Sequence, residues 1–128
     1  MNYNFERMQE SGSIIISLIV DHKYKFRMIL DTGCSNTTID SNALYISGYE
    51  MKDKIGDVEI ETANGIVFSE IFEVKHIQSL GIIKVNFSIQ VYDFIGHGIF
   101  SDYDGLIGLD FVDKYDFCID WVNNVIKI

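Results

Sequence analysis

The sequence predicts a mostly β fold. Among its 128 residues, Ile and Val together number 30, whereas Leu numbers six and Ala two. Side chains branched at Cβ suit pleated sheet and are stiff in helices, so this bias favours strands. Several stretches also alternate apolar and polar residues, and turns must come from Gly, Asn and Asp because the chain lacks proline. The length suits one domain over residues 1–128, and we expect residues 1–12 to be a flexible N-terminal segment.

A hairpin is predicted at the start of the domain. Residues 13–20 (SIIISLIV) form an apolar run of strand length, and residues 21–23 supply a polar turn. In residues 24–30 (YKFRMIL) the even positions are apolar and Lys25 and Arg27 lie between them, which predicts a return strand with one face toward the core. This strand leads directly into residues 31–33 (DTG).

Two further elements are predicted in the middle of the chain. Asp40 or Ser41 is suited to cap a short helix that reaches Tyr45. Residues 58–61 (VEIE) alternate apolar and polar, and residues 66–68 (IVF) are apolar. Asn64-Gly65 between them is a two-residue turn signal, because both residues tolerate positive φ. We therefore expect a projecting β-hairpin centred on Asn64-Gly65.

The second half of the chain contains the clearest strand. From residue 83 to residue 92 the odd positions are apolar and mostly polar residues lie between them. Residues 93–105 are rich in glycine and predict a loop, after which a short helix is expected to begin near Asp110 as its capping residue. Residues 117–128 predict a final hairpin about Asn123-Asn124.

The charge of the chain narrows the classes of function. Ten basic against 19 acidic side chains give a net charge of −9, which disfavours binding to nucleic acid or to an anionic membrane. No stretch approaches the roughly 20 apolar residues of a membrane span. The N-terminus lacks the layout of a signal peptide, and two cysteines are too few for a disulfide framework, so a cytoplasmic location is expected.

Asp31-Thr32-Gly33 is the strongest candidate for chemistry. An apolar strand delivers a carboxylate, and a tight turn after it can direct backbone N–H groups and the hydroxyls of Thr32 and Ser35 at the Asp31 oxygens. The tripeptide alone is equally compatible with an ordinary turn. A second motif raises its significance: Leu106-Ile107-Gly108 follows a glycine-rich loop and precedes a short helix.

Taken together, these motifs resemble the retropepsin-like aspartic proteases, the single-domain class that includes retroviral proteases and bacterial relatives. The resemblance spans about residues 13–122. It is carried by residues 29–37 (ILDTGCSNT), 62–65 (TANG) and 104–111 (DGLIGLDF). The resemblance implies a closed, barrel-like β architecture with a β-hairpin flap and one or two short helices.

By this resemblance Asp31 is the catalytic residue. Thr32 would join a hydrogen-bond lattice between two catalytic loops, Gly33 would permit the turn, and Gly108 would let the late apolar loop pass close to the catalytic one. Ser35 is a further supporting residue. The flap that closes over substrate would be formed by Thr62, Ala63, Asn64, Gly65 and Ile66.

The sequence departs from the family pattern at three points. Cys34 occupies a position that is usually Ala or Ser, the flap lacks the tyrosine of pepsin-type enzymes, and the chain carries one Asp-Thr-Gly only. Peptide hydrolysis by this chemistry uses two carboxylates that share one proton. The expected active unit is therefore a homodimer acting on a peptide or protein substrate, with one Asp31 from each subunit and no cofactor.

No metal site is predicted. His22, His76 and His97 lack the short paired spacing of zinc motifs and are expected to be surface or loop residues. Six acidic residues late in the chain could suggest a second catalytic carboxylate: Asp102, Asp104, Asp110, Asp113, Asp116 and Asp120. Solvated faces and, at Asp110, a helix cap explain them more simply.

Two other readings of the chain remain open. A catalytically inactive, dimeric peptide-binding or interaction module would keep the fold without hydrolysis. An acidic β-rich adaptor would use Asp-Thr-Gly only as a turn, and it would place Asp31 on a convex, solvated surface.

Overall fold

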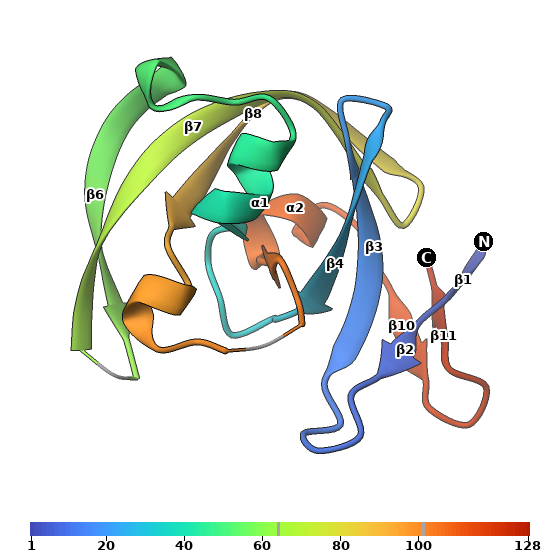
Figure 1. Cartoon of the computed structure of the whole chain (residues 1–128). Coiled ribbons are helices and arrows are strands. Elements are labelled where there is room, and N and C mark those ends of the chain that lie inside the picture. The colour runs from blue at the N-terminus through green and yellow to red at the C-terminus, as the bar shows by residue number, and fades with distance from the viewer. Residues whose placement is uncertain (64, 101) are drawn as a thin grey trace.

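The chain folds as a mostly β protein with two short α-helices, in a computed structural model that describes residues 1–63, 65–100 and 102–128 (Figure 1). Its elements follow the chain in this order: β1 (Asn2–Asn4), β2 (Glu6–Arg7), β3 (Ile14–Val20), β4 (Tyr24–Leu30), β5 (Thr38–Asp40), α1 (Ser41–Ile46), the 3-10 helix η1 (Met51–Asp53), β6 (Lys54–Thr62), β7 (Gly65–Ser79), β8 (Ile82–Tyr92), the 3-10 helix η2 (Ile95–His97), β9 (Gly105–Ile107), α2 (Leu109–Val112), β10 (Cys118–Asp120) and β11 (Val125–Lys127).

The main sheet has a barrel-like arrangement. Its strands lie in the order β2-β3-β4-β9-β5-β8-β7-β6, and β3 also pairs with β7, which joins distant parts of the series. The enclosed core is built from side chains that include Leu18, Met28, Phe72 and Phe111. The predicted mostly β, barrel-like fold with two short helices is confirmed. No helix in the described residues is long and apolar enough to cross a membrane.

The first predicted hairpin is confirmed as β3 and β4, which pair from Ile15↔Ile29 to Val20↔Tyr24. Asp21 and His22 between them both have positive φ, at 52° and 62°. Asp and His adopt the left-handed region of positive φ more readily than most residues. Hairpin turns of types I′ and II′ require positive φ, and their twist matches that of paired strands. The hairpin delivers the chain directly to Asp31.

The hairpin β6–β7 lies where the sequence predicts one, but its turn is shifted by one residue. Thr62 pairs with Gly65, so Gly65, which the sequence predicts in the turn, belongs to β7. Asn64 itself lies outside the described residues. This register pairs Ile60 with Val67, and Val67 is buried. Because a one-residue slip would turn these side chains to the other face, burial fixes the register. Figure 1 shows this hairpin on the side of the molecule opposite the termini.

Strand β8 is confirmed, yet its apolar alternation does not lie on one buried face. Ile89 and Val91 are buried, whereas Ile83 and Val85 are 56% and 65% exposed. Asn86 has a positive φ of 51°, at the break in the ladder between the pairs Val74↔Phe87 and His76↔Val85. The buried side of the strand therefore changes at Asn86.

The chain termini come together in a small sheet of order β1-β11-β10 (Figure 1). The predicted final hairpin is confirmed as β10 and β11, and β1 adds to it through pairs from Asn2↔Lys127 to Asn4↔Val125. The expected flexibility of residues 1–12 stays a prediction, although this segment contributes β1 and β2.

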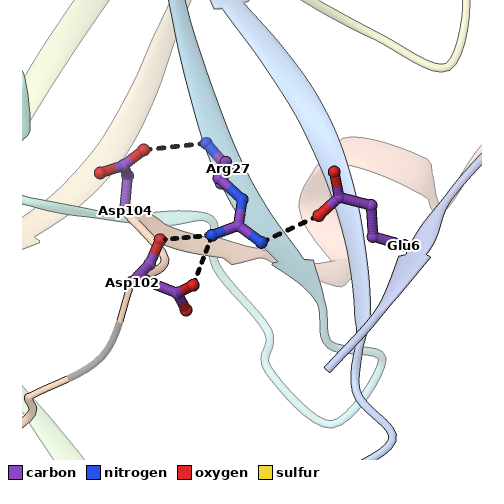
Figure 2. A network of polar contacts seen from close by, with 4 residues as sticks. All are labelled: Glu6, Arg27, Asp102 and Asp104. Carbon is purple, nitrogen blue, oxygen red and sulfur yellow. Dashed lines mark hydrogen bonds and ion pairs between the residues drawn. The ribbon is translucent and has the colours of Figure 1, made fainter. Parts of the chain in front are cut away.

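A polar network fixes the segment before β9 to β4 (Figure 2). The guanidinium of Arg27 lies 2.9 Å from the Glu6 carboxylate and 2.7 Å from that of Asp102, which lowers the pKa of Asp102. The backbone N–H of Arg27 donates to the Asp104 carboxylate at 2.8 Å, and the N–H of Asp104 donates to the Arg27 carbonyl. The solvated role expected for Asp104 is therefore wrong, because its carboxylate anchors β4 to the approach to β9.

Candidate active site

Asp31 lies at the end of β4, where that strand runs parallel to β9. Leu30 pairs with Ile107, and the Asp31 N–H then donates to the Ile107 carbonyl at 3.0 Å. The residue is partly buried and lines a cleft. The adaptor reading placed Asp31 on a convex, solvated surface, and this position does not favour it.

A tight turn follows Asp31 immediately. The Cys34 N–H donates to the Asp31 carbonyl at 3.1 Å, and the Gly33 N–H donates to the Asp31 carboxylate at 3.0 Å. The sequence predicts that the hydroxyls of Thr32 and Ser35 also reach this carboxylate, but both residues are exposed and neither bonds to it in the described part of the chain. Among the described residues, the bond that orients the carboxylate comes from the Gly33 backbone.

Gly108 lies against the loop that follows Asp31. A Cβ at this position would be 2.7 Å from the carbonyl carbon of Asn36 and 2.9 Å from both the Cys34 oxygen and the Thr37 nitrogen. Contacts this short with backbone atoms exclude any side chain. The absence of a side chain thus permits the loop after β9 to pack directly on the loop after β4.

Hydrogen bonds join these two loops. The N–H groups of Leu109 and Asp110 donate to the carbonyls of Cys34 and Ser35 at 2.8 and 3.1 Å. The Gly108 N–H donates to the Thr37 hydroxyl at 3.2 Å. We call residues 34–37 and 108–110 the loop junction. The backbone hydrogen bonds of the loop junction hold in place the turn that follows Asp31.

The short helix predicted near Asp110 is present as α2, but Asp110 lies in its first turn and is not its N-cap. The N-cap of α2 is Gly108, and the Asp110 carboxylate accepts bonds from the Thr37 N–H at 2.9 Å and the Thr37 hydroxyl at 2.8 Å. Burial raises the pKa of Asp110, while the Thr37 bonds, a bond with the Phe111 backbone and the charge of Lys84 oppose that shift. Sequence reasoning missed this contact because no local pattern links residues 73 positions apart.

The cleft beside Asp31 has a volume of about 750 Å³. One wall is the turn after β4, with Gly33, Cys34, Ser35 and Asn36. The opposite wall is β6 and the start of its turn, which includes the predicted flap residues Thr62 and Ala63. Gly65 begins β7 with its carbonyl accepting the Thr62 hydroxyl, and Ile66 is 66% exposed. The cleft thus brings together residues far apart in sequence.

Two cleft residues come from the polar face of β8, and sequence reasoning did not single them out. Gln90 and Tyr92 line the cleft, and they alternate with the buried Ile89 and Val91. The alternation of this strand was visible in the sequence, but nothing in it indicated that its polar face borders Asp31. Burial raises the pKa of Tyr92, so its hydroxyl stays protonated and able to donate.

Cys34 lines the cleft next to Asp31. Its thiol lies 3.0 Å from the Asn36 carbonyl, to which it donates, and burial raises the pKa of the thiol. A raised pKa keeps sulfur in the thiol form, which is a poor nucleophile. Cys34 therefore fits this site as a small packing residue.

The histidines do not gather at the cleft. His22 and His76 stack at a centroid distance of 3.7 Å on the β3–β4 turn and β7, and the ring of His97 interacts with the Asp93 carbonyl. In the residues that the structure covers, no group of three or more His, Cys, Asp or Glu side chains is placed to hold a metal ion. The chemistry of the cleft therefore has to be derived from Asp31.

Comparisons with known proteins agree with this geometry. A retropepsin-like aspartic protease from Rickettsia conorii has a similar structure, with a TM-score of 0.71 at 17% sequence identity over 98% of this chain and 97% of that one. A search of curated proteins gives no match. The family model for aspartyl proteases matches residues 16–111, which include the end of β4, the β6–β7 hairpin and the loop junction. The chain therefore belongs to the aspartyl protease family and has a retropepsin-like fold.

Proposed function

We propose that this protein is an aspartic endopeptidase that acts as a symmetric homodimer, with one Asp31 from each subunit in a shared active site. The observation that carries the proposal is the position of Asp31 just after the end of β4, in a cleft whose other wall is β6 and the start of its turn. Membership of the aspartyl protease family and the retropepsin-like fold support a protease.

The need for a second subunit follows from the chemistry. Peptide hydrolysis of this type requires one ionised carboxylate and one protonated carboxyl group, and the chain has a single Asp-Thr-Gly motif. Two carboxylates a few ångströms apart do not ionise together readily, so a symmetric pair shares one proton. Thr32 and Gly33, next to Asp31, are exposed in the single chain, which leaves this surface accessible to a second copy.

The proposed reaction proceeds in two steps. The ionised Asp31 takes a proton from water as the water oxygen attacks the peptide carbonyl carbon, and the neutral Asp31 donates its proton to the carbonyl oxygen. In the second step the carboxyl group that took the proton from water donates it to the amide nitrogen, while the other, now ionised, takes a proton from a hydroxyl of the tetrahedral intermediate. The carbon–nitrogen bond then breaks, a carboxylic acid and an amine leave, and the pair again shares one proton. Both water activation and carbonyl polarisation come from the carboxyl pair, so the reaction requires no metal ion or organic cofactor.

The substrate would be an extended polypeptide. In this mode the backbone of a peptide pairs with strand edges while alternate side chains enter pockets. Val58, Ile60 and Leu106 line the cleft, which supports selection of apolar side chains. Residues 62–66 would act as the tip of a flap that closes over the bound peptide. A cytoplasmic location stays a prediction.

The first experiment measures cleavage of a denatured protein between about pH 4 and pH 7, with Asp31→Asn as the matched control. The proposal expects fragments from the wild type and a loss of at least about 1,000-fold in kcat/KM for Asp31→Asn, because the variant lacks the ionisable acid. Intact substrate at every pH, with a dimer that binds peptide, would instead identify the inactive peptide-binding module.

The second experiment measures sedimentation over a range of concentrations, with and without a peptide. The proposal expects a dimer under the conditions in which cleavage occurs. A strict monomer at high concentration with peptide present would leave the carboxyl pair incomplete and would contradict the dimeric mechanism.

A further inference from the structure

We propose that Asp110 is a positioning residue for Asp31, which holds the loop junction in its active geometry through Thr37. The inference rests on the proposed function, because it assigns Asp110 a role in the same hydrolysis. Asp110 does not line the cleft in the described part of the chain, so it acts through another residue and does not touch the substrate.

Asp110 is linked to both loops of the loop junction through hydrogen bonds of Thr37. A single carboxylate oxygen, Oδ1 of Asp110, accepts both the backbone N–H and the hydroxyl of Thr37, at 2.9 and 2.8 Å. The same hydroxyl accepts the Gly108 N–H at 3.2 Å. Asp110 therefore bonds directly to the loop after β4 and, through Thr37, to the turn that begins its own helix. One side chain locks the two halves of the loop junction together.

Burial makes this contact hard to replace with water. Thr37 is 0% exposed, and its backbone carbonyl accepts the Gln90 N–H from β8 at 3.0 Å. Buried donors that lose their acceptor retain the full cost of desolvation, so the chain would rearrange to find another partner. A rearrangement at Thr37 would move the segment that begins three residues after Asp31.

The role requires an acceptor oxygen and does not require a negative charge. A protonated carboxyl group keeps one oxygen with free lone pairs, and an Asn side chain offers an amide oxygen in the same place. Asn at this position would therefore preserve both bonds from Thr37, whereas Ala would remove them. This difference provides a matched pair of variants.

The test compares kcat and KM for Asp110→Asn and Asp110→Ala in the full-length protein, at concentrations where sedimentation shows the wild-type assembly. For Asp110→Ala we expect kcat to fall about 10- to 100-fold with KM within about 3-fold, since a displacement near 1 Å costs this much in a positioned site. For Asp110→Asn we expect kcat within about 3-fold of the wild type. Unchanged kcat in a folded Asp110→Ala protein, or equal losses in both variants, would overturn the inference.

A second pair covers the case in which Asp110→Ala does not fold. Thr37→Val removes the hydroxyl and keeps the branched shape and the backbone N–H, whereas Thr37→Ser keeps the hydroxyl. We expect the kcat loss for Thr37→Val, about 10-fold, to be largely absent in Thr37→Ser. Equal kcat values for these two variants would contradict the inference.

Failure of the proposed function gives a different result. If the wild type shows no Asp31-dependent cleavage, the proposed hydrolysis is wrong. Amide hydrogen exchange can still test whether Asp110 positions the loop junction. We then expect the Gly108 and Thr37 amides to exchange about 10-fold faster or more in Asp110→Ala than in Asp110→Asn. Equal exchange rates in the two variants would overturn the positioning role independently of any cleavage.

Discussion

The two walls of the cleft are built differently. The loop junction is joined by backbone hydrogen bonds, a buried threonine and a glycine that admits no side chain. The opposite wall is β6, the edge strand of the main sheet, which is joined to the sheet through its ladder with β7. At the tip of this hairpin the side chains of Ile66 and Phe68 are 66% and 75% exposed, although β7 from Glu70 onward pairs with β8. The wall that carries Asp31 is thus held by several kinds of contact, whereas β6 and the hairpin tip are held mainly by one ladder.

This difference suits a site that must hold a carboxylate still and also admit a long substrate. Segments with few buried contacts open at low free-energy cost, and loops or hairpins that cover active sites are commonly of this kind. We therefore expect substitutions in the loop junction to damage stability and kcat, and substitutions in the hairpin to act mainly on substrate binding.

The largest effect is expected for Gly108→Ala. The added Cβ would approach the Asn36 carbonyl carbon to 2.7 Å, and neither loop has a flexible side chain at that point to move aside. We expect a loss of about 3 kcal/mol in the free energy of unfolding, measured by urea denaturation.

The matched control for this change lies in the other wall. A Cβ at Gly65 would meet no atom within 4 Å, although the φ of 111° there is strained for any other residue. Gly65→Ala should therefore cost about 1 to 2 kcal/mol. A larger loss for Gly65→Ala than for Gly108→Ala would reverse the comparison of the two walls.

A moderate effect on binding is expected for Ile60→Ala. Ile60 lines the cleft from β6 and is only partly buried, so its truncation removes apolar contact with a substrate. We expect KM to rise about 10-fold with kcat within about 2-fold. Steady-state kinetics on one peptide measures both, and a fall in kcat with KM unchanged would show that the hairpin does more than bind.

A smaller effect is expected in the pH dependence of stability. Burial raises the pKa of Asp110 above its ordinary value of 3.8, and this effect outweighs the opposing effects that include the Thr37 bonds and Lys84. The thiol of Cys34 is a further titratable group near Asp110. The folded state therefore holds this proton more tightly than the unfolded chain. The contribution of protonated Asp110 to the free energy of unfolding is fully present below pH 3.8 and is lost as the pH rises through the raised pKa.

Asp110→Asn removes this titration and makes the effect measurable. We expect the stability of the wild type relative to Asp110→Asn to fall as the pH rises above 3.8, the ordinary pKa of Asp, as followed by urea midpoints. A difference that is constant or grows with pH would show that the charged form is the one favoured in the loop junction.

The smallest effect is expected for Phe68→Ser in the hairpin. Phe68 is 75% exposed and pairs with Glu59 across the ladder. We expect a change within about 0.5 kcal/mol in the free energy of unfolding. A loss above about 2 kcal/mol would show that this face is covered in solution, and sedimentation of the variant would then test whether a second copy covers it.

Local patterns predicted the strands and the position of Asp31 well. Alternation in residues 24–30 correctly predicted a strand that leads directly to Asp31. The turn that precedes this strand, at Asp21 and His22, was also predicted. These features depend on neighbours in the sequence, where period and turn chemistry determine the outcome. The resemblance to retropepsins added the overall architecture, which the structure confirms.

Contacts between distant segments could not be predicted in this way. The bonds from Thr37 to Asp110 and from Arg27 to Asp102 join residues more than 70 positions apart, and no single sequence encodes such pairs visibly. The exposure of Ile83 and Val85 could not be predicted either, because it depends on the positive φ of Asn86, which changes the buried side of the strand. The turn of the β6–β7 hairpin was predicted one residue late because tertiary burial fixed its register.

The central claim is that two copies of Asp31 form each active site, and mixed dimers test it most directly. Wild type and Asp31→Asn subunits are refolded together in equal amounts, and the cleavage rate is compared with that of wild type at the same total concentration. If each site needs both carboxyl groups, only wild-type pairs are active and roughly a quarter of the rate remains. A remaining rate of about half would mean that each subunit works with its own Asp31 alone, and it would contradict the dimeric mechanism.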